Sequence, residues 1–98
     1  MNEPVVVACQ AVVGGWSCTV RVGPEGGTTE HGVSVSATEL GRFAPNATEP
    51  TALVEQSFGF LLEREPRESI LRRFALSDIE RYFPEYPKVI AEASASSP

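Results

Sequence analysis

Hydrophobic and polar residues alternate through the first third of the chain, and this period of two is typical of β-strands with one buried face. The valine-rich segment 4–37 is interrupted by glycine-rich turns. Gly14 and Gly15 stand where a two-residue hairpin turn needs positive φ angles. A second turn within residues 23–28 returns the chain to a third strand at about 29–37. The pattern therefore predicts a three-stranded antiparallel meander.

The position of the first turn also predicts how the first two strands pair. If Val13 lies opposite Trp16, the apolar side chains of the hairpin share one face. In this register Cys9 lies opposite Val20 and diagonal to Cys18. A diagonal pair is poorly placed for a disulfide, so we expect both cysteines to be reduced and buried.

Beyond residue 50 the hydrophobic period changes to about 3.6 residues, which indicates an amphipathic helix. Its apolar stripe comprises Leu53, Val54, Phe58, Leu61 and Leu62. Pro50 suits the first turn of this helix. The connector at residues 38–49 contains a proline and an asparagine, and we expect one helical turn within it.

Two shorter helices are expected after the long one. Pro66 disfavours helix before it and suits the first turn of a new helix, which we expect over residues 67–74. Ser77 and Glu80 have the spacing of a capping box, which predicts a third helix. Two prolines at 84 and 87 should close the helical region, which spans about 50–91.

These elements predict one α+β domain over residues 1–92, in which one long and two short helices pack on one face of the meander. A chain of 98 residues with 42% hydrophobic positions is long enough for one core and too short for two. Residues 93–98, with the sequence ASASSP, have nothing to bury, and we expect a disordered tail there.

Charge and composition narrow the classes of function. A net charge of −5, from 13 acidic and 8 basic side chains, disfavours binding to nucleic acid or to anionic lipid. No apolar run approaches the roughly 20 residues that cross a bilayer, and the amino terminus has no positive region before its apolar run. We expect a cytoplasmic protein without a membrane partner.

His31 is the only histidine and the natural centre for acid–base chemistry. The predicted register puts Cys18 diagonal to His31 and Cys9 a full strand away, so neither thiol can form a nucleophile pair with it. A zinc site made from these three residues would lack a fourth ligand. We expect no catalytic residue, metal or cofactor, and keep an enzyme or ligand-binding site using His31 with a cysteine as the first alternative.

Five of the eight basic side chains fall between residues 63 and 81, and nucleic-acid binding through these predicted helical arginines is the second alternative. They are Arg64, Arg67, Arg72, Arg73 and Arg81. Acidic residues in the same span cancel their charge, so solvated helix surfaces with local ion pairs are the favoured interpretation.

The segment YFPEYP holds three aromatic residues between prolines near the end of the chain. Aromatic side chains displayed beside arginine are typical of binding hot spots, so Arg81, Tyr82 and Tyr86 are the candidate partner-binding residues. The competing interpretation is that Phe83 and one of the two tyrosines close the end of the core. We predict a non-catalytic protein-interaction or self-association module.

Several segments resemble a family of small, stand-alone bacterial proteins of unassigned function. The carboxy-terminal half of that family is matched by Ser57–Phe58, Phe60–Pro66, Ser69–Leu71, Ile79 and Tyr82–Tyr86. The valine-rich strands, with a His-x-Val-x-Val run beginning at His31, are similar to its other half. The resemblance implies the fold, and it attaches no activity or ligand to any residue.

Overall fold

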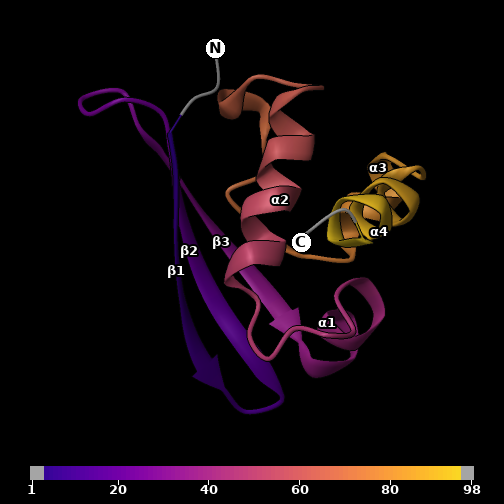
Figure 1. Ribbon diagram of the computed structural model, residues 1–98. Coiled ribbons are helices and arrows are strands. Elements are labelled where there is room, and N and C mark those ends of the chain that lie inside the picture. The colour runs from indigo at the N-terminus through magenta and orange to yellow at the C-terminus, as the bar shows by residue number, and fades with distance from the viewer. Residues whose placement is uncertain (1–3, 96–98) are drawn as a thin grey trace.

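A computed structural model describes residues 4–95 and has a β-sheet with helices packed on one face (Figure 1). The α+β class is confirmed. The elements in chain order are β1 (Val5–Val12), β2 (Gly15–Val22), β3 (Thr29–Ser36), α1 (Ala37–Phe43), α2 (Thr51–Leu62), the short 3₁₀ helix η1 (Arg67–Ser69), β4 (Arg73–Ala75), α3 (Asp78–Tyr82) and α4 (Tyr86–Ala95).

The sheet has four strands in the order β1-β2-β3-β4, and the fourth was not predicted. The first three strands form the predicted antiparallel meander, and β4 pairs with β3 in parallel. The helix expected over 67–74 is wrong. Only η1 is helical there, because the chain is then drawn along the edge of β3: the Gly32 N–H donates to the Arg72 carbonyl and the Leu76 N–H to the Ser34 carbonyl.

The first hairpin turns one residue earlier than a turn at both glycines would require, which shifts the strand pairing by two residues. Val12 pairs with Gly15, and of the two glycines in this hairpin only Gly14 has a positive φ, of 82°. Gly15 is instead the first residue of β2. Glycine is needed at this position because a Cβ there would lie 2.1 Å from the Val35 carbonyl oxygen of β3. The predicted register is therefore wrong by two residues. The predicted apolar face is unchanged, since a shift of two keeps every side chain on its side.

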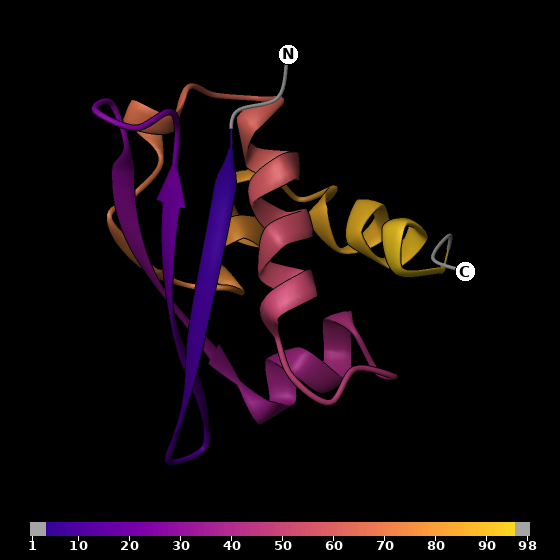
Figure 2. The same ribbon diagram turned by 60° about the vertical axis from the view of Figure 1, so that its left-hand side comes forward.

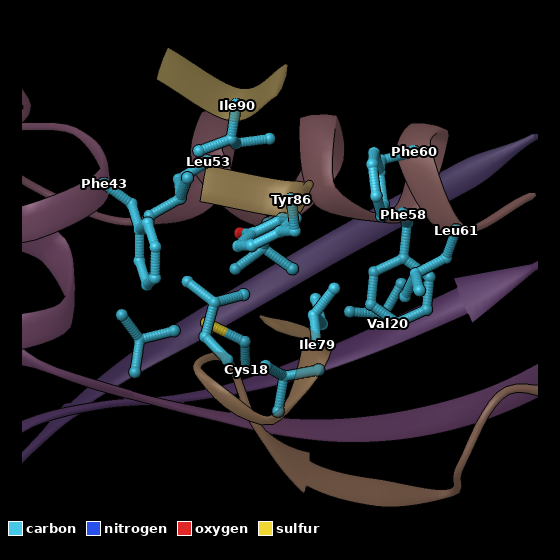
Figure 3. Close-up of a cluster of buried hydrophobic side chains, with 14 of the residues drawn as sticks. Cys18, Val20, Phe43, Leu53, Phe58, Phe60, Leu61, Ile79, Tyr86 and Ile90 are labelled. Carbon is cyan, nitrogen blue, oxygen red and sulfur yellow. The ribbon is translucent and has the colours of Figure 1, made fainter. Parts of the chain in front are cut away.

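Helix α2 covers one face of the sheet (Figures 1 and 2) and supplies more buried apolar side chains than any other single element of the described chain. Four of the five predicted stripe residues are buried, and the fifth, Leu62, is half-buried. Phe60 and Ser57 are also buried, because α2 packs against α4 as well as against the sheet. Figure 3 shows side chains of α2 meeting Cys18 and Val20 from the sheet and Ile90 from α4.

The capping box lies elsewhere than predicted. Ser77 precedes α3 with helical angles and makes no side-chain cap, so the box predicted with Glu80 is absent. The reciprocal pair is Ser36 with Glu39, at the start of α1. Glu39 also accepts a hydrogen bond from the Ser77 N–H at 2.8 Å, so one carboxylate joins the starts of α1 and α3.

The last helix was also missed. Pro87 does not end the helical region, because it stands in the first turn of α4, where a missing N–H costs nothing. Helix α4 includes residues 93–95, which the sequence assigns to a disordered tail. The remainder of that predicted tail, residues 96–98, lies outside the described residues.

Candidate interaction site

The structure separates the three predicted partner-binding residues. Arg81 and Tyr82 lie exposed on α3, with 65% of Tyr82 accessible to solvent. Tyr86 is completely buried, so its predicted contact with a partner is wrong. Its hydroxyl shares a 2.7 Å hydrogen bond with the Ser57 hydroxyl, and burial raises the pKa of Tyr86 well above its usual range. The alternative in which Phe83 and one tyrosine close the core agrees with the structure, since Tyr86 is buried and Phe83 packs against the core.

Tyr82 borders an apolar hollow of about 390 Å³, which we call the Tyr82 groove. Its apolar lining comprises Leu61, Ile70, Leu71, Phe74, Ile79, Tyr82 and Phe83, and its polar lining comprises Glu65, Ser69 and Asp78. The groove lies between the end of α2, the η1–β4 segment and α3. Leu71 is 49% exposed. The rim of the groove therefore carries two large exposed apolar side chains.

Hydrogen bonds from the sheet fix the groove's wall. The His31 Nδ1 donates to the Leu71 carbonyl at 2.9 Å, which holds the segment before β4 against β3. The Ala75 N–H donates to the Asp78 carboxylate at 3.0 Å, which joins β4 to the start of α3. Because both bonds engage backbone groups of the lining segment, the wall is positioned by the fold.

The groove is acidic as well as apolar. Glu65 and Asp78 supply carboxylates, and none of its lining residues is lysine or arginine. Asp78 is half-buried, with one oxygen 4.0 Å from an Arg81 guanidinium nitrogen at the surface. The arrangement offers an apolar floor, aromatic faces and negative charge, which suit an apolar side chain next to a cation.

His31 has a structural role. It is 2% exposed, and the centre of its ring lies 5.4 Å from that of the Phe58 ring. Its Nε2 forms a 2.8 Å hydrogen bond with the Thr29 hydroxyl, so both ring nitrogens are engaged. Val20 lies opposite His31 on the neighbouring strand. A general base with both nitrogens committed to the fold has none left for a substrate.

Cys9 and Cys18 form a disulfide, so the predicted reduced thiols are wrong. The corrected register places the two residues directly opposite one another. This bond removes the thiol that the first alternative requires beside His31. Disulfides persist in oxidising compartments and are rare in the cytosol, so the bond also argues against the predicted cytoplasmic location.

The five arginines of the second alternative do not share a helix. Only Arg81 lies within an α-helix, because Arg67 opens η1 and Arg73 opens β4. Arg64 lies over the Phe60 ring at 3.6 Å and contacts Glu63 and Glu85. The positive charge of the five arginines is spread over several elements and partly paired with carboxylates, which is a poor arrangement for following a phosphate backbone.

Comparison with protein-family models, with curated proteins and with solved structures finds no match to this chain. The resemblance to a bacterial family therefore stays a prediction. Within residues 4–95, no helix has both the length and the apolar character that a membrane span requires.

The sequence pattern indicated one side of the groove and missed the other. Tyr82 and Arg81 stood out as an aromatic residue beside an arginine. Leu71 and Glu65 did not, because a helix over 67–74 would have turned Leu71 into the core. Strand β4 gave no signal either, because its three residues, Arg73–Ala75, are too few to establish a period of two.

Proposed function

We propose that this protein is a non-catalytic protein-interaction module whose Tyr82 groove binds a segment of a partner protein. The observation that carries the proposal is the exposure of Leu71 and Tyr82 beside a concave apolar surface. Exposed apolar patches on small proteins commonly mark binding surfaces, and tyrosine is frequent among the residues that dominate binding energy.

The groove also favours one chemistry of partner. Its carboxylates, Glu65 and Asp78, attract basic side chains, and the net charge of −5 adds to this field. The aromatic faces of Phe74 and Tyr82 attract cations as well. The favoured partner segment carries large apolar residues alternating with lysine or arginine.

Matched peptides test this proposal by isothermal titration calorimetry. The probe is the acetylated and amidated pentapeptide Leu-Lys-Phe-Lys-Leu, compared with versions in which glutamine or glutamate replaces both lysines. We expect the lysine peptide to bind best and the glutamate peptide at least about tenfold more weakly, since two attractive contacts become repulsive. Affinity for the lysine peptide should fall as salt is raised.

Two variants test whether the peptide binds in the Tyr82 groove. Tyr82→Ala should weaken the lysine peptide about tenfold or more, as expected for a hot-spot aromatic. Val6→Ala removes an equally exposed apolar side chain from the opposite face of the sheet and should leave the affinity unchanged. Absence of binding by all three peptides, or equal binding to the Tyr82→Ala variant, would overturn the proposal.

A further inference from the structure

Strand β1 is an edge strand without the usual protection against pairing. It stands first in the sheet order, and its eight residues, VVVACQAV, include no charge, proline or glycine. Its pairing with β2 is continuous from Val5 to Val12, without a bulge. Natural edge strands are normally blunted by charge, proline, bulges or short length. None of these devices is present in β1.

The backbone groups that β1 leaves unpaired follow from its pairing with β2. Cys9 and Cys18 have Cα atoms 4.0 Å apart, which is the close spacing of a non-hydrogen-bonded antiparallel pair. Hydrogen-bonded and non-hydrogen-bonded pairs alternate along an antiparallel ladder, so the even-numbered residues of β1 direct their N–H and C=O groups toward β2. The Pro4 carbonyl agrees, since it accepts a hydrogen bond from the Gly23 N–H beyond the end of β2.

The odd-numbered residues of β1 therefore direct their N–H and C=O groups to the open side. These residues are Val5, Val7, Cys9 and Ala11. Within the described part of the chain, no backbone hydrogen bond joins these groups to another element. Helix α2 packs above β1, on the core face, and does not pair with this edge (Figure 2).

We propose that the occupant of this edge is β1 of a second copy of the chain, added antiparallel about a two-fold axis. One register uses the whole edge. It places Ala8 opposite Ala8 of the second copy, Val7 opposite Cys9 and Val5 opposite Ala11. All four outward residues of each copy are then paired, and every outward N–H meets a carbonyl. A shift of two residues in either direction leaves an end residue without a partner inside the strand.

The side chains of β1 are compatible with this register. Because the strand is uncharged, no like charges face one another across the new strand pair. Ala8, on the axis, is small enough for the close approach of a non-hydrogen-bonded pair. Val6, now 62% exposed, would lie beside Gln10 of the second copy and lose accessible surface. A two-fold interface of this kind uses the same patch on both copies.

The axis runs perpendicular to the sheet, so the product is a continuous eight-stranded sheet with both helical layers on one side. The two α2 helices then flank the axis. Their solvent side includes the small residues Ala52 and Gly59 and the acidic Glu55. Each copy carries a net charge of −5, so salt should strengthen association by screening their repulsion.

Light-scattering mass of the disulfide-intact protein tests the association. We expect twice the chain mass of 10.6 kDa at concentrations near 100 µM, with a larger dimer fraction in 0.5 M sodium chloride. Ala8→Lys places two like charges on the axis and should give a monomer. Thr19→Lys adds the same charge to the same exposed face of the adjacent strand and should leave the dimer intact.

Cross-linking tests the register. Ala8→Cys should form an intermolecular disulfide in a glutathione redox buffer, seen as a dimer on a non-reducing gel. Gln10→Cys lies on the same face but four residues out of register with its symmetry mate, and should not cross-link. A monomeric wild-type protein in both salts, or cross-linking of Gln10→Cys in place of Ala8→Cys, would overturn the proposal. A dimer that survives Ala8→Lys would show that copies meet elsewhere and would overturn it as well.

Discussion

Cys9 lies directly opposite Cys18 across strands β1 and β2, and a disulfide joins them. Cys18 is buried beneath the helices, whereas Cys9 is half-buried near the edge of the sheet. The bond fixes the register of the hairpin that carries the unprotected edge. It also ties the edge strand to the core through one of the core's own side chains.

Removing this disulfide should lower stability. Only nine positions separate the two cysteines, so a cross-link of this loop is worth about 2 to 3 kcal/mol through restriction of the unfolded chain. We expect the Cys9→Ala, Cys18→Ala double variant to unfold at a correspondingly lower urea concentration than the oxidised protein. Equal midpoints would show that the bond contributes nothing. Alkylation of the unreduced protein should add no label to either residue.

The two tyrosines should respond differently to loss of a hydroxyl. Tyr86→Phe removes the buried partner of Ser57 and should cost about 1 to 2 kcal/mol of unfolding free energy. Tyr82→Phe alters an exposed residue and should change the unfolding free energy by less than about 0.5 kcal/mol. Urea denaturation of both variants measures the contrast. Equal costs would contradict the assignment of Tyr86 to the core and Tyr82 to the surface.

His31 should matter for the position of the groove wall. His31→Ala leaves the Leu71 carbonyl without its donor, and we expect a cost of about 1 to 3 kcal/mol. Amide hydrogen exchange near Leu71 should accelerate in the same variant. Ser34→Ala, on the exposed face of the same strand, is the matched control and should be close to neutral. An unchanged unfolding midpoint for His31→Ala would contradict this structural role.

The environment of Glu39 predicts that the free energy of unfolding falls in acid. Burial alone would raise the pKa of Glu39, but hydrogen bonds from Ser36 and Ser77 outweigh it, and the net shift lowers the pKa below its usual 4.5. A lowered folded-state pKa stabilises the protein fully above the unfolded-state value, and this contribution is lost as the pH falls through the folded-state pKa.

The Glu39→Gln variant isolates this contribution. We expect it to be less stable than the wild type at pH 7, with the difference shrinking as the pH falls below about 4.5. Unfolding midpoints measured from pH 7 to pH 3 provide the comparison. A difference between the two proteins that stays constant over this range would contradict the role of the ionised carboxylate.

Period and composition predicted the parts of the fold that depend on local patterning. The apolar face of the hairpin and the stripe of α2 follow from spacings of two and of three to four residues. Gly15 and β4 could not be predicted in this way, because both depend on the approach of β3. The Val35 carbonyl lies so close to Gly15 that a Cβ would not fit there. Strand β4 forms because β3 offers an open edge.

The candidate site shows the same division. The aromatic residue beside an arginine correctly indicated Tyr82 as exposed, but nothing local distinguishes Tyr82 from Tyr86. Ser57 decides that difference from another helix, 29 positions away in sequence. The disulfide was missed for a related reason, since a turn placed one residue too late shifts the pairing by two residues and makes an opposed pair of cysteines diagonal.

The most direct test of the binding role is a map of amide chemical-shift changes when the lysine pentapeptide saturates the ¹⁵N-labelled protein. We predict that the largest changes fall around the groove, at Leu71, Ile79 and Tyr82, while amides of the hairpin at Val13 and Gly14 stay unchanged. Changes centred on the hairpin, or a spectrum that does not respond to the peptide, would contradict the assignment of the Tyr82 groove as the binding surface.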